Sequence, residues 1–326
     1  TATATPRVRD DIAEQLRLKE HEVHIGTFDR PNLAYTVQPR RDLFAQLGGV
    51  LERHPGESGI VYCIRRADTE SLAEYLTRKG HRARPYHAGL NDRQRKENQE
   101  AFVKDEVDII VATIAFGMGI DKPNVRFVVH AGMPKSIEHY QQESGRAGRD
   151  GLASECVLLY SGQDYGIWKY LFEKNSDDPD ENLVLLPGED LDAARERVAA
   201  NRRIAVKAGI AKLNEMYRYC TQPACRHRAL SEYFGQRYSQ RNCGACDNCL
   251  GAPDEDTEES ARVARAIIEA VSQVEERYGA TYIVNLLTAS KAEPRIRERG
   301  HDRLQVHGAF RNENPRDVRD WVEQMC

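Results

Sequence analysis

Residues 108–151 constrain the fold of this chain more than any other stretch. Two short apolar runs rich in β-branched residues, 107–113 and 125–131, are typical of buried parallel strands. The segment between them, 114–123, carries two glycines and a proline and is expected to be a loop. A helical stretch and a run with two arginines, 141–151, follow. This order of strand, loop, strand, helix and paired arginines indicates a lobe that responds to a bound nucleotide.

The two arginines suit a phosphate ligand. Arg146 and Arg149 lie three residues apart, and each directly follows a glycine. A guanidinium group is planar, permanently charged and matched to phosphate oxygens. The glycines remove side-chain bulk, so the backbone can turn tightly and let both groups reach a ligand.

Alternating strand and helix signals extend on both sides of this stretch. We expect helices over 11–17, 43–53, 67–79 and 91–104, and strands over 22–28, 59–63, 83–86 and 155–160. The alternation predicts a largely parallel sheet covered by helices, with Pro85 disfavouring a central place for its strand. Ligands of such sheets bind beyond the carboxyl ends of the strands. Arg65, His87, the 113–121 loop and the two arginines are therefore expected to converge on one edge.

Four of the eight cysteines have metal-ligand spacing, Cys225-x17-Cys243-x2-Cys246-x2-Cys249. Three thiolates on one tight loop, with a fourth arriving from a preceding helix, favour a structural tetrahedral zinc site. Iron–sulfur ligation and disulfides are alternatives. Cys220, five residues before Cys225, is an alternative ligand.

Charge is distributed unevenly. Net charge is −4, but residues 195–241 hold eleven Lys and Arg against three acidic residues, which favours contact with nucleic acid. Two acidic runs, 176–181 and 254–259, are expected to be solvated linkers. No apolar run approaches the roughly 18 residues that span a bilayer, and no signal peptide is evident. We therefore expect no membrane partner and a cytoplasmic, bacterial nucleoid-associated location.

The carboxyl-terminal block, 261–326, contains apolar residues at helical spacing. They are Val263, Ile267, Ile268, Val271 and Val274. Thr281 is expected to cap a second helix, and residues 294–304 form a short basic element that includes Arg295 and Arg297. Three short helices with a basic third are what a winged helix needs to lie on duplex phosphates. An ordinary small helical cap would show the same periodicity.

Two segments resemble motifs V and VI of the RecQ family of DNA helicases. They are Ala112-Thr-Ile-Ala-Phe-Gly-Met-Gly-Ile-Asp-Lys-Pro-Asn-Val-Arg-Phe-Val-Val-His130 and Gln142-Glu-Ser-Gly-Arg-Ala-Gly-Arg-Asp-Gly151. DEAD-box RNA helicases more often show different residues in both motifs. Residues 1–5 resemble motif III and 62–65 fall in motif IV, while Arg226 and residues 233–235 match the RecQ zinc subdomain.

The resemblance implies a RecA-like α/β lobe with a parallel sheet over 1–165, a mostly helical zinc-binding subdomain over 166–252 and an incomplete winged-helix-like domain over 253–326. It implies an ATP- and Mg²⁺-dependent helicase of 3′-to-5′ polarity that acts on single strands and single-strand/duplex junctions of DNA. Arg149 becomes the candidate arginine finger and Arg146 a second phosphate or interlobe contact.

The remaining site residues follow from the same resemblance. Predicted nucleotide contacts are Asp121, Gly119 and Gln142; predicted DNA contacts are Thr113, His87, Arg65, Arg295 and Arg297. For three of these positions a purely structural role is an alternative. His87 is equally expected to be a satisfied structural histidine, Thr113 to be a capping residue, and Asp121 merely to join two loops through an arginine.

The sequence contains no Gly-x-x-x-x-Gly-Lys-Ser/Thr phosphate loop. We therefore expect the first helicase lobe to lie outside this chain, and the chain alone to lack ATPase and unwinding activity. A non-enzymatic, zinc-containing DNA-binding module is the alternative function. A related RNA helicase is disfavoured by the zinc and winged-helix segments.

Overall fold

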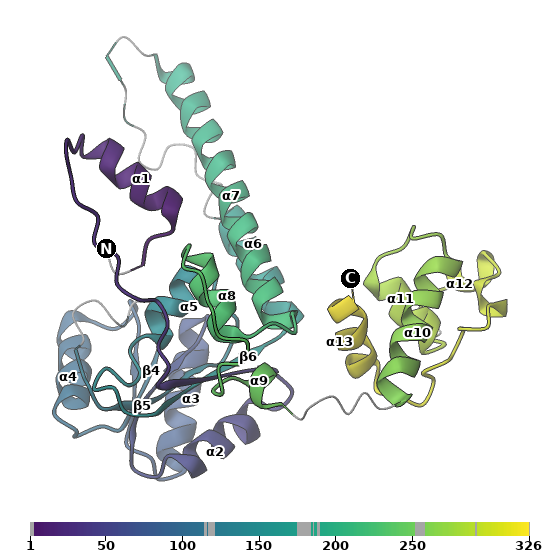
Figure 1. Cartoon of the computed structure of the whole chain (residues 1–326), viewed down its shortest axis with the longest axis horizontal. Coiled ribbons are helices and arrows are strands. Elements are labelled where there is room, and N and C mark those ends of the chain that lie inside the picture. The colour runs from purple at the N-terminus through teal and green to yellow at the C-terminus, as the bar shows by residue number, and fades with distance from the viewer. Residues whose placement is uncertain are drawn as a thin grey trace. The chain divides into compact units, whose positions relative to one another are not determined.

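The computed structural model describes residues 3–113, 116, 121–174, 184, 186–187, 190–251, 258–290 and 292–325. The chain divides into two compact units, Thr1–Gly251 and Ala252–Cys326. Figure 1 shows a sheet covered by helices in the first unit and a cluster of helices in the second. Each unit is considered separately.

A six-stranded sheet forms the centre of the first unit. Its order is β1 (Leu33–Pro39), β6 (Ser154–Tyr160), β5 (Val125–His130), β2 (Ser58–Tyr62), β4 (Ile109–Ala112) and β3 (Ala83–Tyr86). All neighbouring strands run parallel, which confirms the predicted sheet. The strand with Pro85 lies at one edge, as its missing N–H requires. The opposite edge, β1, was not predicted as a strand.

Helices cover both faces of the sheet. Successive strand residues point to opposite faces, so Ile60, Ile110 and Val128 enter one apolar cluster and Val61, Val111 and Val129 enter the other. On the second face lie α2 (Leu43–Arg53) and α3 (Arg66–Arg78). On the first face lie α4 (Asp92–Val103), α5 (Ile137–Ser144), α7 (Leu191–Thr221) and α8 (Arg226–Tyr233). Burial on both faces explains why the strands are almost entirely apolar.

Helix starts follow local capping chemistry. Asn91 caps α4, because its side chain accepts from the Gln94 amide while the Gln94 side chain accepts from the Asn91 amide. The amino-terminal helix, α1, spans Pro6–Gln15 and begins before the predicted 11–17, since proline suits a first helical turn.

The strand predicted over 22–28 is wrong. No strand is present there, and Val23 and Ile25 are 58% and 49% exposed. An alternating pattern forms a strand only where a neighbour pairs with its backbone. Here the Phe28 amide instead donates to Gln236 Oε1 (2.8 Å), and Gln236 Nε2 donates to the Gly26 carbonyl (2.7 Å).

Two helices follow the last strand of the sheet. They are α6 (Gly162–Lys174) and the long α7, which contact each other, and Asp190 caps α7 by accepting from the Ala193 amide. A short helix, α9 (Asp247–Leu250), follows α8. Within the described residues, no helix is long and apolar enough to cross a membrane.

The regular elements described in the second unit are all helical, and turns join them. They are α10 (Glu258–Gln273), α11 (Ala280–Leu287), α12 (Arg295–Glu298), the 3-10 turn η1 (His301–Arg303) and α13 (Pro315–Met325). The residues predicted to have helical spacing lie on α10 or, for Val274, directly after it; Ile267 and Val274 are buried and Ile268 is 59% exposed. Thr281 is not a cap, because α11 begins at Ala280 with Gly279, two residues before Thr281, at the N-cap position.

Candidate nucleotide-responsive edge and metal centre

The carboxyl ends of β2, β3 and β4 place three predicted residues on one edge of the sheet. Arg65 is the N-cap residue of α3 behind β2, His87 directly follows β3, and Thr113 follows β4. Because the strands are parallel, these ends lie on the same side. The edge is therefore a candidate ligand-binding surface.

The three side chains differ in availability. Arg65 is exposed and its Nε lies 2.9 Å from Asp68 Oδ2. Thr113 is half-buried, and its amide donates to the Tyr86 carbonyl at 3.1 Å. His87 is buried: Nδ1 accepts from the Gly89 amide at 3.1 Å and Nε2 lies 3.1 Å from Glu70 Oε1. This burial favours the structural interpretation of the His87 side chain.

The two arginines occupy different surroundings. Arg149 is 36% exposed, and its guanidinium donates to Asp121 Oδ1 at 2.9 Å. Asp121 itself is 86% exposed, so the pair is open to solvent and a competing phosphate can displace the carboxylate. Gln142 is exposed on α5. Gly119 lies outside the described residues.

Arg146 is buried beside the end of β2. It is 7% exposed and forms a side-chain hydrogen bond with Tyr62, whose hydroxyl also donates to the Phe116 carbonyl at 3.2 Å. Burial raises the pKa of Tyr62, so the phenol stays protonated. Arg146 therefore contacts the chain just after β4 through Tyr62.

Residues 145–151, called the arginine loop below, are held by two side chains that the sequence did not indicate. Arg30 donates to the carbonyls of Ala147 (3.0 Å) and Gly148 (2.8 Å), and Asn32 Nδ2 donates to the Gly148 carbonyl (2.9 Å). Gly148 has φ +56°, and a Cβ there would lie 2.5 Å from Asn32 Nδ2. Glycine is therefore required between the two arginines.

The end of the same loop is held by a second arginine. Arg126 donates to both carboxylate oxygens of Asp150 at 2.7 Å, and this hydrogen bonding lowers the pKa of Asp150. In the sequence, Arg30, Asn32 and Arg126 are marked only by being polar side chains close to the start of a strand.

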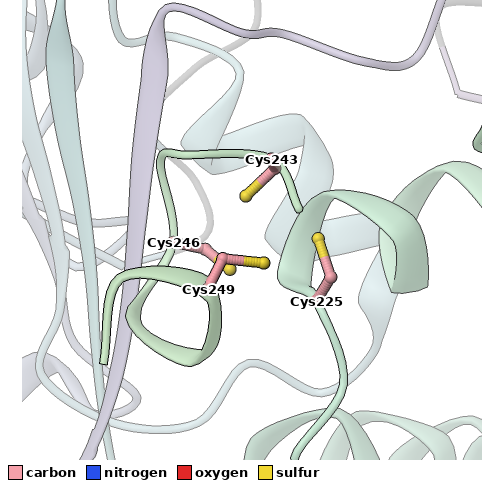
Figure 2. A group of neighbouring side chains, drawn as sticks. All are labelled: Cys225, Cys243, Cys246 and Cys249. Carbon is pink, nitrogen blue, oxygen red and sulfur yellow. The ribbon is translucent and has the colours of Figure 1, made fainter. Parts of the chain in front are cut away.

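Figure 2 shows the side chains of Cys225, Cys243, Cys246 and Cys249 converging on one point. Their sulfur atoms all lie within 4.8 Å of one another. Tetrahedral zinc–thiolate bonds of about 2.3 Å place sulfurs about 3.8 Å apart, so the donor set fits zinc. Cys225 is the N-cap residue of α8 rather than part of the preceding helix. Cys220 is buried in α7 and does not belong to the group.

Three family models match consecutive parts of the chain. They are the helicase conserved C-terminal domain over 42–151, the RecQ zinc-binding model over 188–250 and the RQC domain over 254–326. All four cysteines lie in the second of these. The chain belongs to the RecQ family.

Comparison over the length of this chain agrees with this assignment. The ATP-dependent DNA helicase RecQ of Bacillus subtilis is 37% identical over 324 residues, covering 99% of this chain and 50% of the relative. That of Pasteurella multocida is 36% identical, covering 100% of this chain and 47% of the relative. The chain spans about half the length of these curated relatives.

Among solved structures, S. cerevisiae Dbp5 bound to RNA and ADP BeF3 has a TM-score of 0.45 at 19% identity, covering 64% of this chain and 54% of that one.

The RecQ cysteine centre is joined directly to the sheet. The Tyr35 amide donates to the Ala245 carbonyl at 3.0 Å, and Tyr35 forms a parallel bridge with Cys246. Asp247 Oδ2 accepts from the Val37 amide at 2.9 Å. Residues 243–249, called the metal-site loop below, therefore bind to the outer side of β1. This contact helps to stabilise β1, the edge strand that the sequence did not predict.

Arg226 and Asp247 brace the RecQ metal-site loop from inside. The Arg226 side chain is 5% exposed, and its Nε and Nη2 donate to the two oxygens of Asp247 at 2.9 and 3.1 Å. The same guanidinium lies over the Tyr219 ring, 5.4 Å from its centroid. The sequence indicated Arg226 but not its partner.

The two DNA-binding arginines predicted for the second unit are exposed. Arg295 pairs with Glu293 at 2.6 Å and lies over the Tyr282 ring, 5.8 Å from its centroid. Arg297, two residues later, is also exposed. Both lie within the segment that the RQC domain model matches.

Proposed function

We propose that this chain is the carboxyl-terminal part of an ATP-dependent DNA helicase that unwinds duplex DNA with 3′-to-5′ polarity in replication, recombination or repair. The solvent-accessible Arg149–Asp121 ion pair carries the proposal. RecQ family membership supports it. We further propose the division into a RecA-like lobe over 1–165, a zinc subdomain over 166–252 and a winged-helix domain over 253–326.

The proposed partner of this chain is a lobe that holds ATP and Mg²⁺. The absence of a phosphate loop from this sequence supports that division of labour. When the lobes close, Arg149 leaves Asp121 and stabilises the charge on the transferring phosphoryl group. Arg146 and Gln142 act as further contacts at the nucleotide, with Gly119 in the neighbouring loop.

DNA is gripped in two places. Thr113, Arg65 and the backbone near His87 contact single-strand phosphates, and ATP-driven closure moves this grip along the strand. Arg295 and Arg297 contact duplex phosphates through the second unit. Zinc holds the metal-site loop in shape and takes no part in the reaction. This work takes place on chromosomal DNA in the cytoplasm.

Hydrolysis measurements test this proposal. The chain alone is expected to show no DNA-stimulated ATP hydrolysis, and the chain joined to a phosphate-loop lobe is expected to show it. Hydrolysis by the chain alone contradicts the division of labour, and no hydrolysis by the joined protein contradicts the helicase assignment.

Binding to tailed duplex DNA is the second test. Its logarithmic affinity is expected to fall with salt with a slope of about −0.9 per phosphate contact. Binding that does not depend on salt, or equal binding to RNA, counts against DNA phosphate recognition.

The alternative function is a non-enzymatic, zinc-containing DNA-binding module. The lack of a phosphate loop in the sequence favours it. DNA binding by the chain, with no hydrolysis after joining to the phosphate-loop lobe, is the result expected for this alternative.

A further inference from the structure

A buried polar pair lies directly beneath the arginine loop. His130 ends β5 and Glu143 lies in the last turn of α5, with side chains 2% and 6% exposed. Nε2 of His130 is 2.8 Å from Oε2 of Glu143. No step proposed above uses either residue.

Burying a carboxylate is costly unless it is paired, and apolar side chains of similar volume often stabilise such positions equally well. The pair is therefore not explained by stability alone. Its position gives another reason for its presence.

Both members of the pair contact the surroundings of Arg146. The Arg146 amide donates to the Glu143 carbonyl at 3.3 Å, so Glu143 holds the backbone of this arginine as well as the histidine. The His130 ring stacks on Tyr62, with centroids 5.2 Å apart and planes at 21°. Tyr62 in turn bonds to the Arg146 side chain.

The turn between α5 and Arg146 leaves little freedom. A Cβ on Gly145 would lie 2.8 Å from the Gln141 carbonyl oxygen, and the Gly145 amide donates to that oxygen at 3.0 Å. A shift of the last turn of α5 is therefore passed on to Arg146 and, three residues later, to Arg149.

We propose that the Glu143–His130 pair is a positioning device that fixes the last turn of α5, and with it Arg146 and Arg149, against the ends of β2 and β5. This inference rests on the proposed function, because it assigns the arginines a task in ATP hydrolysis. A misplacement of the arginines by about 1 Å is enough to lower turnover on the order of 10²-fold.

The chain contains a matched control pair at the opposite end of the strands. His54 Nε2 lies 3.0 Å from Glu155 Oε2, with side chains 16% and 17% exposed. Glu155 is the second residue of β6, at the amino end of the parallel strands. The centroid of the His54 ring lies 5.3 Å from that of Phe127, which belongs to the apolar cluster under α2 and α3, whereas Tyr62 belongs to the cluster on the other face. The same chemistry is thus available on the face of the sheet opposite Tyr62.

The test compares His130→Leu, His130→Gln and His54→Leu in the chain joined to a phosphate-loop lobe. H130L is expected to lower kcat of DNA-stimulated ATP hydrolysis by about 10- to 100-fold with KM for ATP changed less than about twofold. H130Q is expected to recover most of this loss, because its amide N–H can still donate to Glu143. H54L is expected to leave kcat unchanged.

A second measurement is independent of activity. In the chain alone, H130L is expected to raise amide hydrogen exchange of residues 143–149 by about tenfold, while H54L leaves it unchanged. If H130L does not fold, the isosteric Glu143→Gln is measured in its place. Exchange that stays unchanged, or kcat lost equally in H130L and H130Q, overturns the inference.

The two proposals fail in distinguishable ways. If Arg149→Ala abolishes hydrolysis and H130L does not reduce it, only the positioning role is wrong. If the joined protein does not hydrolyse ATP at all, the proposed function is wrong, and hydrogen exchange alone decides whether the pair fixes the loop.

Discussion

The cysteine centre and the arginine loop are both short, glycine-containing segments, but their side chains are used differently. The four cysteines have one shared task, and their sulfurs meet within 4.8 Å. The two arginines lie three residues apart, yet Arg146 is 7% exposed and hydrogen-bonded to Tyr62, whereas Arg149 is 36% exposed and paired with Asp121. The four cysteines thus share one task, while the two arginines are distinguished by what packs on them.

The two regions also differ in how they are held. The metal-site loop is held by side chains of its own, the cysteines and Asp247, the latter paired with Arg226. The arginine loop is held through its backbone carbonyls, which accept from Arg30 and Asn32 of another segment. Metal removal should therefore affect the first region strongly, and side-chain substitutions should affect the second mainly through rate.

Loss of a metal ligand is expected to have the largest effect. Cys243→Ser should abolish binding of about one zinc per chain and remove on the order of 10 kcal/mol from the folding of the zinc subdomain. Elemental analysis and thermal unfolding measure both effects. Cys220→Ala is the control, because this buried cysteine lies outside the group and should leave the zinc content unchanged. Zinc lost in C220A and kept in C243S would reverse the ligand assignment.

Substitution of the exposed arginine should come next. Arg149→Ala is expected to lower ATP turnover of the chain joined to a phosphate-loop lobe by about 10³- to 10⁵-fold, with normal zinc content. Arg149→Lys should not restore turnover, since lysine lacks the planar fork. Arg93→Ala is the control, because Arg93 is an exposed arginine paired with Glu97 on α4. A loss of less than tenfold in R149A would remove the reason for assigning the two arginines different tasks.

The buried brace of the metal-site loop should contribute less. Arg226→Ala removes the arginine that pairs with Asp247 and is expected to cost about 3–5 kcal/mol of unfolding free energy, measured by urea denaturation. The exposed Arg78–Glu74 pair provides the control: Arg78→Ala should cost less than about 1 kcal/mol. Equal costs would show that burial of the Arg226–Asp247 pair is energetically unimportant.

A pH effect at the junction of α5 and α7 should be the smallest. Glu138 lies 2.7 Å from Lys212. Burial acts to raise the pKa of Glu138, but hydrogen bonds from Lys212 and Ser136 hold it below its ordinary value of 4.5. Because the folded-state pKa is lowered, the pair stabilises the protein above the unfolded-state pKa and loses this contribution as pH falls through the folded-state pKa.

Glu138→Gln should therefore destabilise the protein by less than about 1 kcal/mol near neutral pH, and this difference should shrink at acid pH. Urea unfolding of both proteins over a pH series measures it. A difference that stays constant with pH would assign the effect to packing rather than charge.

Much of the fold follows from local patterns. Apolar β-branched runs, capping residues such as Asn91 and helical spacing predicted most strands and helices of the first unit. Local patterns gave the wrong result in two places, because a strand forms only where another segment pairs with its backbone. Residues 22–28 alternate like a strand but have no strand to pair with, and β1 was overlooked although β6 and the metal-site loop pair with it on either side.

By itself, the sequence determined the parallel α/β alternation, the cysteine spacing and the presence of two phosphate-matched arginines, because these depend on residue type and short-range spacing. Only the tertiary structure decided that Arg146 is buried, that Arg149 is accessible, and that His130, Glu143 and Tyr62 meet beneath them. Those contacts join β2, β5 and α5, which are far apart in the chain. Exposure and pairing are set by the sheet order that brings these elements together.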